Sequence, residues 1–179
     1  MRKIAVILGS KTDLPQCVAG LKLLKAAIEA GEVELYMGQV IISSIHRATD
    51  DTLNLVSELS SGADVDVLIT GAGWANHLTG VCDSYLRYGL DDAKINVIGV
   101  AFEDPNDSTH TATAIASIIH VPKTKVIYQD ANGIFCGGDG FARACQYAVS
   151  GELPEIKLPE PVSQERLSLD EAIAVADAA

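Results

Sequence analysis

Residues 4–13 read Ile-Ala-Val-Ile-Leu-Gly-Ser-Lys-Thr-Asp, an unbroken apolar run followed at once by glycine and polar residues. Such a run is typical of a strand that is buried on both faces of a parallel sheet. Asp13 can cap a following helix, and Pro15 suits the first turn of that helix. The stretch therefore predicts a buried strand, a short loop and a helix, in that order.

The same alternation continues along the chain. Apolar stripes near a 3.6-residue period predict helices, and short apolar runs predict strands. Alternation of this kind indicates an α/β fold with a parallel sheet, right-handed crossovers and helices on both faces. The predicted strands cover residues 4–8, 33–42, 65–69, 95–100 and 126–128, and the predicted helices cover roughly residues 14–28, 49–59, 78–89, 112–119 and 140–150.

The length of 179 residues suits one domain, which we expect over residues 1–151. Residues 151–161 hold three prolines and no periodic pattern, so they are predicted to form a linker. Ser168 and Glu171 have the spacing of a capping box, which predicts a short final helix. Residues 152–179 are therefore expected to be a linker and a C-terminal helix that extend the same domain.

The composition is acidic, with a formal net charge of −11 and a pI near 4.6. A field of this sign repels nucleic acid and anionic membranes, so neither is an expected partner. Residues 152–177 contribute −5 of this charge, because seven carboxylates stand against Lys157 and Arg166. An anionic small ligand would therefore need a local positive site of its own.

The cysteines and the apolar segments indicate a soluble cytoplasmic protein. Four cysteines are scattered without a C-x-x-C pair or a zinc-finger spacing, so reduced thiols and no metal site are expected. The apolar run at residues 4–8 is too short for a signal peptide. No apolar stretch approaches the ~18 residues that a membrane span requires.

Polar residues that can carry chemistry follow the first three predicted strands. The three loops are Gly9 to Asp13, Ser44 to Arg47, and Gly71 to His77. Ligands of open α/β sheets bind at the carboxyl ends of the strands, which meet at one edge. We therefore expect the three loops to form one ligand site.

The first loop is a candidate anion site. Gly9 and the backbone amides, together with the Ser10 and Thr12 hydroxyls, lie where a helix begins. Asp13 could either cap that helix or bind a ribose diol. A simple turn with a helix cap is the alternative interpretation of the loop. The spacing of a Walker loop is absent.

The second and third loops add charge, a proton carrier and close backbone approach. Arg47 can pair with a phosphate through two hydrogen bonds, and His46 can exchange protons near neutral pH. A lone histidine is more often structural, but an arginine beside it at a strand end favours a functional role. Gly71 and Gly73 let the backbone approach a ligand, and His77 lies just beyond them. No dinucleotide-binding fingerprint is completed here.

Taken in order, the loops resemble the PurE family of purine biosynthesis, the aminoimidazole ribonucleotide carboxylases and mutases. The family pattern is roughly G-S-x-S-D, then S-A-H-R, then G-A-G-G-A-A-H-L-P-G. This chain reads G-S-K-T-D from residue 9, S-I-H-R from residue 44 and G-A-G-W-A-N-H-L-T-G from residue 71. A later stretch, S-I-I-H-V-P from residue 117, resembles the family's S-I-V-Q-M-P. The resemblance runs through residues 3–150.

The resemblance implies a three-layer flavodoxin-like parallel sheet and a homo-octamer with sites at subunit contacts. It implies a small-molecule substrate of the 5-aminoimidazole ribonucleotide type, with neither a metal nor a redox cofactor. His46 followed by Arg47, with His77 in the third loop, resembles the branch that moves a carboxyl group from the exocyclic nitrogen to C4 of the ring. A related carboxylase that adds free carbon dioxide to this or another heterocycle, and a non-catalytic nucleotide-binding module, are the alternatives.

The resemblance also assigns roles to residues of this chain. The phosphate would be held by the hydroxyls of the first two loops and Arg47, and the ribose hydroxyls by Asp13. His46 would protonate the carbamate nitrogen and later remove the C4 proton, while the third loop contacts the ring and the carboxyl group. The expected substrate-binding residues are Gly9, Ser10, Thr12, Asp13, Ser44, Arg47, Ala72 and Gly73, and the expected catalytic residues are His46 and His77.

The chain departs from the family pattern at a few positions. Trp74 replaces a glycine in the third loop, where an indole must either turn outward or reshape the pocket. Thr79 replaces a proline, and His120 replaces a glutamine. Thr113-Ala114 stands where Asp-Ser is common. These departures are compatible with a divergent mutase or with a relative that acts on a different heterocycle.

Overall fold

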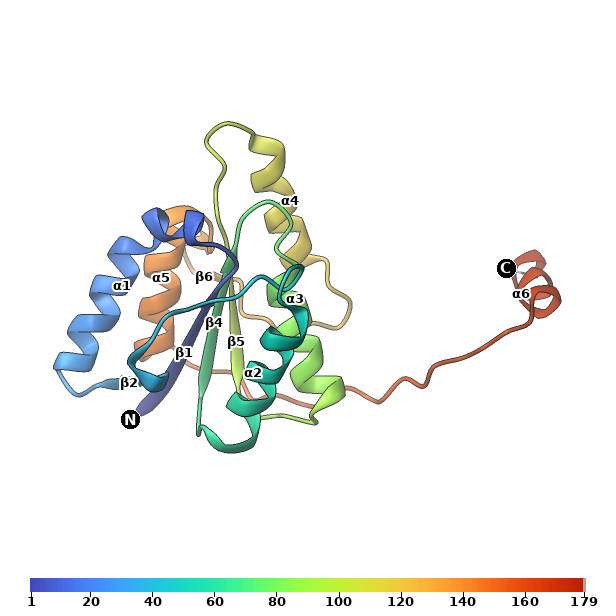
Figure 1. The fold of residues 1–179 in the computed structure, drawn as a ribbon, viewed down its shortest axis with the longest axis horizontal. Helices are drawn as coiled ribbons and strands as arrows, with labels where there is room; N and C mark the ends of the chain where they lie inside the picture. The colour runs from blue at the N-terminus through green and yellow to red at the C-terminus, as the bar shows by residue number, and fades with distance from the viewer. Residues whose placement is uncertain (179) are drawn as a thin grey trace.

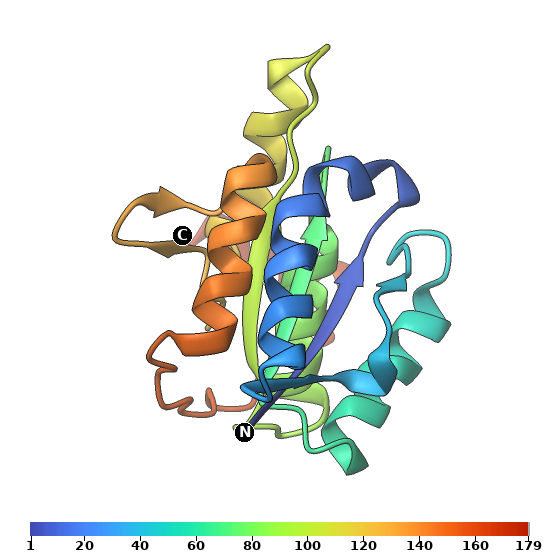
Figure 2. The ribbon, with the colours of Figure 1, turned by 90° about the vertical axis from the view of Figure 1, so that its left-hand side faces the viewer.

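The computed structural model describes residues 1–178 and shows three layers (Figure 1). The central sheet has the strand order β2-β1-β4-β5, with β3 also pairing with β1, and all of these pairs are parallel. Helices α1 and α5 lie side by side over one face (Figure 2), and α2, α3 and α4 cover the other. The strands are β1 (Arg2–Leu8), β2 (Val33–Leu35), β3 (Ile41–Ile42), β4 (Val67–Ala72) and β5 (Asn96–Ala101).

Alternate residues of the central strands feed two separate cores. In β1, Ile4, Val6 and Leu8 pack into the core beneath α1 and α5, while Ala5 and Ile7 pack into the core beneath the other helices. This arrangement explains the unbroken apolar run, because a strand covered on both faces has no solvent side. The helices are α1 (Leu14–Glu29), α2 (Thr49–Gly62), α3 (His77–Ser84), α4 (Ser108–Ile119), α5 (Gly137–Ser150) and α6 (Leu169–Asp177).

The predicted strand over residues 33–42 is wrong in its middle. The chain forms β2, a 3-10 turn at Tyr36–Gly38 and then β3. Met37 and Gly38 adopt left-handed φ values of 50° and 65°, which no strand can accommodate. Tyr36 is held inward by a hydrogen bond from its hydroxyl to Glu58 of α2. The break therefore comes from a local turn and a tertiary contact, which a β-rich sequence does not reveal.

Other predicted boundaries of strands and helices also differ from those in the structure. The predicted strand at residues 126–128 pairs with β5 only at the bridge between Ile98 and Ile127. It leads into a hairpin of β6 (Gln129–Asp130) and β7 (Gly133–Ile134) that the sequence pattern did not predict. Helix α4 begins four residues earlier than predicted, because Asp107 Oδ1 accepts a hydrogen bond from the Thr109 amide and so caps it. Helix α5 likewise begins at residue 137 rather than 140.

A buried ion network fixes the chain just after α3, where a π-helical turn spans Tyr85–Gly89. The Arg87 guanidinium, 1% exposed, pairs with Asp83 and Asp92 and donates to the carbonyls of Asp92 and Ile95. Asp83 also accepts from the amide of Lys125. Each buried charge in this network has a partner of opposite sign. The positions of these partners mean that the network joins α3 to the following loop and to the edge of the sheet.

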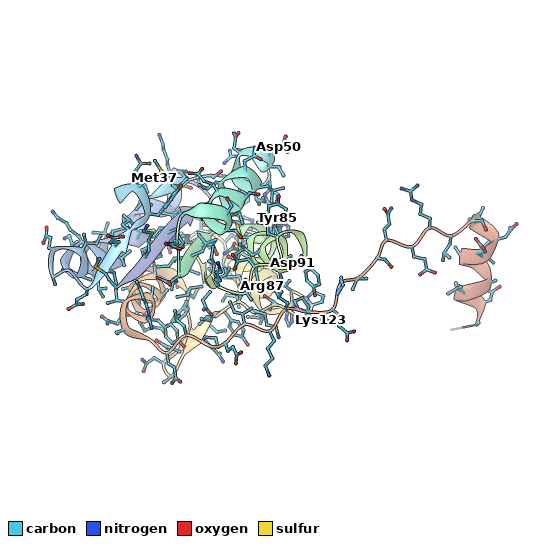
Figure 3. All side chains as sticks on the ribbon, turned by 90° about the horizontal axis from the view of Figure 1, so that it is seen from below. Met37, Asp50, Tyr85, Arg87, Asp91 and Lys123 are labelled. Carbon is cyan, nitrogen blue, oxygen red and sulfur yellow. The ribbon has the colours of Figure 1, made fainter. Side chains whose placement is uncertain are left out.

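The C-terminal segment leaves the body as an extended chain that ends in α6, which stands apart in Figures 1 and 3. The predicted capping box is confirmed, since Ser168 accepts from the Glu171 amide and Glu171 accepts from the Ser168 amide. No residue of α6 is buried. Among residues 1–178, none of the helices combines the length and the apolar character that a membrane crossing requires.

Candidate functional site

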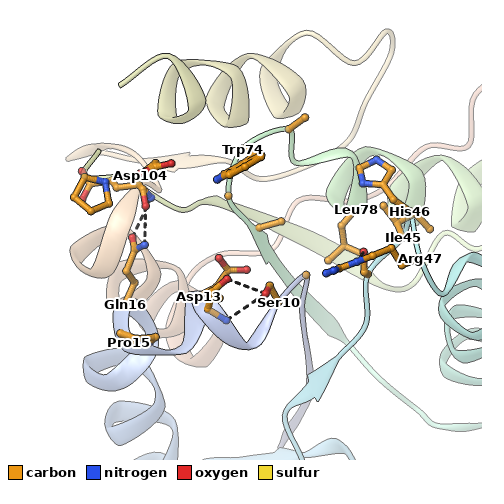
Figure 4. A pocket seen from close by; sticks show the side chains of 18 residues that line it. Ser10, Asp13, Pro15, Gln16, Ile45, His46, Arg47, Trp74, Leu78 and Asp104 are labelled. Atoms are coloured by element: carbon orange, nitrogen blue, oxygen red, sulfur yellow. Dashed lines mark hydrogen bonds between the residues drawn. The ribbon is translucent and has the colours of Figure 1, made fainter. Parts of the chain in front are cut away.

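The three predicted loops meet at the carboxyl edge of the sheet, where they line one cavity of about 880 Å³ (Figure 4). All eight of the predicted substrate-binding residues lie on its wall, and so does His46. His77 does not line this cavity; it lies on the wall of a neighbouring apolar hollow of about 630 Å³. The rule that ligands bind at the carboxyl ends of the strands, the strand-end rule, thus brings these residues together at one cavity, while His77 lies on the wall of the next.

The first loop is drawn tightly against the third. The Gly9 amide donates to the Gly71 carbonyl at 2.8 Å, and a Cβ atom on Gly9 would lie only 2.9 Å from the Ala72 Cβ. Glycine is required here by this close approach. Ser10 Oγ accepts hydrogen bonds from the Thr12 amide at 3.2 Å and the Thr12 hydroxyl at 2.8 Å. Both hydroxyls are thus gathered beside the cavity at the start of the 3-10 helix Lys11–Asp13.

Asp13 is a buried carboxyl on the cavity wall, with 8% of the residue exposed. Desolvation by burial raises its pKa from 3.8 to about 6, against the opposing effect of the Ser10 backbone hydrogen bond. The prediction that Asp13 could cap α1 is corrected, because its side chain makes no capping hydrogen bond there. Ser10 caps the preceding 3-10 turn instead, which leaves the Asp13 carboxyl turned toward the cavity.

The second loop presents Arg47 and His46 side by side, both exposed. Arg47 donates from Nε to Ser44 Oγ at 3.4 Å, and its amide donates to the Ser44 carbonyl. Within residues 1–178 its guanidinium forms no ion pair. Its terminal N–H groups are therefore available to an anionic ligand.

His46 and His77 are in direct contact. His46 Nε2 lies 2.8 Å from His77 Nδ1, and the two rings meet edge to face with centroids 5.0 Å apart. One proton can occupy this hydrogen bond, so the two rings must hold complementary tautomers. His77 therefore acts on the cavity through His46, which is the ring that reaches the cavity wall.

Asn76 explains why the third loop holds His77 in place. Its side chain is fully buried, donates from Nδ2 to the Val100 carbonyl at 2.8 Å and accepts from the Thr79 amide at 3.1 Å. The Asn76 amide in turn donates to Ser117 Oγ. Asn76 thus caps α3 and ties it to β5 and α4, so that His77 starts the helix from a rigid anchor.

Trp74 takes an unusual conformation between Gly73 and Ala75. Its φ of 58° is left-handed, a region that costs a residue with a side chain roughly 1–2 kcal/mol. The indole is 65% exposed and stacks on His110 of α4, with ring centroids 4.3 Å apart and planes 21° apart. The indole turns outward from the loop backbone, yet still contributes to the cavity wall.

A fourth loop, after β5, also lines the cavity and was missed by the sequence analysis. Gln16 of α1 donates to the Glu103 carbonyl at 2.9 Å and accepts from the Glu103 amide at 3.0 Å, which draws this loop over the cavity. The strand-end rule could have found it, because the loop follows the fourth predicted strand. The additional wall residues are Glu103, Asp104 and Pro105.

The charges on the wall divide the cavity into two ends. Asp104 and Asp107 hold His110 between them, at 2.8 Å and 3.8 Å. The pKa of Asp104 lies below its usual value, chiefly because His110 hydrogen-bonds to it. Arg47 lies at the opposite side, next to His46 (Figure 4). An anionic phosphate would therefore find its cationic partner on the Arg47 side of the cavity. Among residues 1–178, no three His, Cys, Asp or Glu side chains gather in a way that could hold a metal ion.

Comparisons with known proteins place the chain in a family. A family model described as AIR carboxylase, where AIR is aminoimidazole ribonucleotide, matches residues 3–129. An N5-carboxyaminoimidazole ribonucleotide mutase of Pyrococcus abyssi (strain GE5 / Orsay) is 29% identical over 160 residues, which make up 89% of this chain and 78% of that protein. The matched range holds all three predicted loops.

Solved structures share the fold. Treponema denticola PurE superimposes with a TM-score of 0.51 at 18% identity, covering 82% of this chain and 88% of that one. A variant of Treponema denticola PurE2 gives a TM-score of 0.55 at 19% identity, covering 83% and 87%. These neighbours and the parallel sheet confirm the predicted flavodoxin-like α/β architecture.

Proposed function

The chain belongs to the AIR carboxylase family, and from that premise we propose that it is the N5-carboxyaminoimidazole ribonucleotide mutase of de novo purine biosynthesis, acting in the cytoplasm. Membership makes it an enzyme that handles a carboxyl group. The observation that carries the mutase assignment is the His46–His77 pair, joined at 2.8 Å beside Arg47 at the cavity. The name of the Pyrococcus abyssi relative supports the same reaction.

The phosphate of the ribonucleotide would bind at the end of the cavity that holds the cation. Arg47 offers its terminal N–H groups, and Ser44 Oγ lies 3.4 Å from Arg47 Nε. The Ser10 and Thr12 hydroxyls, 2.8 Å apart, complete the donors from the first loop. An arginine fork with hydroxyls around it is well suited to a dianionic phosphate.

Asp13 would accept hydrogen bonds from the ribose hydroxyls. Its carboxyl lines the cavity, and an ideal Cβ built on Gly73 lies 3.6 Å from Asp13 Oδ1. The ribose would thus lie against the third loop, with Ala72 and Gly73 facing the ring and the migrating carboxyl group. Because neither Ala72 nor Gly73 has a bulky side chain, the backbone can approach the ring closely.

The chemistry needs two proton transfers, one to the carbamate nitrogen and one from C4. His46 in its protonated form gives a proton to the carbamate nitrogen, the N–C bond breaks, and carbon dioxide and the neutral aminoimidazole remain. Carbon C4 of the electron-rich ring then attacks carbon dioxide, which forms the new C–C bond. His46 removes the C4 proton and returns to its starting state, so atoms and charges balance. His77 would hold His46 in the correct tautomer through their hydrogen bond.

Free carbon dioxide has to be retained during these steps, which a single chain does not achieve. His46 and His77 are both exposed. The apolar hollow beside His77, lined by Leu53, Val81 and Tyr85 among others, adjoins the pair. We propose a homo-octamer in which neighbouring subunits cover this face and exclude water from the site. Exposed Leu169 and Ile173 of α6, in the extension over residues 152–179, would be covered in the same assembly.

The decisive assay offers the enzyme two substrates. One is N5-carboxyaminoimidazole ribonucleotide, and the other is aminoimidazole ribonucleotide with bicarbonate. We expect the wild type to convert the first without added bicarbonate, and His46→Asn to lose at least about 100-fold in kcat, the usual worth of a general acid–base group. His120→Asn is the matched control, because His120 is an exposed histidine at the end of α4 that lies on the wall of neither cavity.

The other outcomes of this assay would contradict the mutase assignment or support a different function. A wild type that converts neither substrate contradicts the proposal. Turnover of aminoimidazole ribonucleotide with bicarbonate, but not of the carbamate, would indicate a carboxylase. If the protein binds the ribonucleotide but shows no turnover that depends on His46, it would be a nucleotide-binding module. Sedimentation analysis tests the assembly separately, since an octamer of 18.9 kDa chains has a mass of about 150 kDa.

A further inference from the structure

Among residues 1–178, His110 is the one aromatic ring that stacks on Trp74. His110 packs against one side of the indole at a centroid distance of 4.3 Å, and Trp74 lines the cavity while His110 does not. Two thirds of the residue is exposed. A large aromatic ring that is held on one side and open on the other can accept a second planar ring.

The side chain that supports the indole is itself held by two contacts. His110 Nδ1 lies 2.8 Å from Asp104 Oδ2, and its Nε2 lies 3.8 Å from Asp107 Oδ2. Asp104 is fixed in turn, because Oδ1 accepts from the Asn106 amide and its own amide donates to Thr111 Oγ1. The imidazole plane is therefore set by the loop before α4, and the indole plane follows from it.

The backbone of Trp74 is strained, and strain of this kind persists where the surroundings impose it and is concentrated at functional sites. The loop accepts a left-handed φ of 58° at a position where the PurE pattern has glycine. The indole then lies one residue beyond Gly73, the residue that approaches Asp13. Trp74 is thus next to the place where the ribose would end and the heterocycle would begin.

We propose that the open face of Trp74 is the platform on which the aminoimidazole ring of the substrate stacks, and that His110 is the positioning residue for that platform. This inference rests on the proposed function, because it assigns the ring end of the same ribonucleotide site. Arg47 holds the phosphate, Asp13 the ribose and Trp74 the ring. Trp74 then contributes to the choice of heterocycle through the area and flatness of the stack.

The chain contains a single tryptophan, so its fluorescence reports on this residue alone. Aminoimidazole ribonucleotide and ribose 5-phosphate share the phosphate and the ribose, but only the first has the ring. Calorimetry would show whether each one binds. We expect saturating aminoimidazole ribonucleotide to quench or shift the emission of Trp74, and bound ribose 5-phosphate to leave it unchanged.

Substitutions test the same contact through kinetics. Trp74→Leu keeps an apolar side chain with the same backbone strain but has no aromatic face, and we expect KM to rise about 3- to 10-fold. Trp74→Phe keeps a smaller aromatic face and should stay within about twofold of the wild type. His110→Ala should raise KM in the wild-type background but add nothing in the Trp74→Leu background, because both act through one stack. His120→Ala is the matched control, because His120 is an exposed histidine at the C-cap of the same helix. Thermal unfolding of each variant checks that it is folded.

The outcomes separate this inference from the mutase assignment. Three results overturn the platform alone. The first is an unchanged Trp74 emission although calorimetry shows that aminoimidazole ribonucleotide binds. The others are an equal emission change with ribose 5-phosphate and an unchanged KM in Trp74→Leu. Emission that follows protein concentration rather than ligand would assign Trp74 to a subunit contact and also overturns it. A ring-dependent emission change without turnover of either substrate supports the platform and overturns the mutase. No binding at all overturns both.

Discussion

Asp13 lowers the stability of the folded chain, and Asp13→Asn should reveal this. The carboxyl is held on the cavity wall with only 8% of the residue exposed, and burial raises its pKa from 3.8 to about 6. Asparagine has nearly the same shape and can still accept the hydrogen bond from the Ser10 backbone. The substitution therefore removes the charge and little else.

The magnitude follows from the shift in pKa. One pKa unit corresponds to about 1.4 kcal/mol, so the ionised carboxylate destabilises the folded state by at most about 3 kcal/mol near neutral pH. Contact with the solvent-filled cavity reduces this value, and we expect Asp13→Asn to raise the free energy of unfolding by about 1–3 kcal/mol at pH 7. Between the unfolded pKa of 3.8 and the folded pKa of about 6, the folded state binds more protons than the unfolded state. Stability contributed by this group is therefore lost as the pH rises through that window.

The assay is urea unfolding followed by circular dichroism, at a fixed protein concentration because assembly would add to the apparent stability. The wild type, Asp13→Asn and the control Asp50→Asn are compared from about pH 4.5 to 7.5. Asp50 is exposed in the first turn of α2, so its substitution changes the net charge equally while costing at most about 1 kcal/mol.

The advantage of Asp13→Asn should be small at the acidic end and grow as the pH approaches 7. A variant that is less stable than the wild type at pH 7, or a difference that does not change with pH, would refute the reasoning. The same variant should bind the ribonucleotide more weakly, because an ionised acceptor for the ribose hydroxyls is gone. A more stable and less active protein is what a site optimised for binding predicts.

Three further substitutions test other parts of the structure. Arg87→Met leaves Asp83 and Asp92 buried without their cation and should cost about 3–5 kcal/mol in urea unfolding; an unchanged midpoint would contradict the network. Asn76→Ala removes the cap of α3 and should lower the unfolding free energy by about 1–2 kcal/mol. It should also lower kcat, because His77 loses its anchor. A loss of stability with full activity would show that the cap does not support catalysis. Arg47→Lys cannot bind phosphate through a fork and should raise KM about tenfold in steady-state kinetics, with equal KM values as the contrary result.

Local sequence signals were sufficient to predict the sheet, most helices and the edge at which the site lies. The apolar run at residues 4–8 became β1, and the capping box at Ser168 became the start of α6. The three loops that follow strand ends meet at one cavity, although residues 9 and 73 are far apart in the chain. These features depend on residue periodicity and on topology, both of which a sequence pattern contains.

The features that the pattern could not predict depend on contacts between distant residues. The hydrogen bond of His46 with His77 joins residues 31 positions apart, and the Gln16–Glu103 bonds join residues 87 apart. The break in the strand at Met37 is a left-handed turn without a glycine at that position. The direction of the Trp74 indole is set by His110, whose place depends on where α4 begins. In each case tertiary packing, rather than local propensity, determines the outcome.

Following the migrating carboxyl group tests the mutase proposal most directly. N5-carboxyaminoimidazole ribonucleotide labelled with carbon-13 in its carboxyl group is turned over in excess unlabelled bicarbonate, and the product is examined by NMR. We expect the product to keep the label in its C4 carboxyl group and the rate to be independent of bicarbonate, because neighbouring subunits of the proposed assembly would retain carbon dioxide in the cavity between His46 and the third loop. An unlabelled product, or a reaction that proceeds only when bicarbonate is added, would contradict the account.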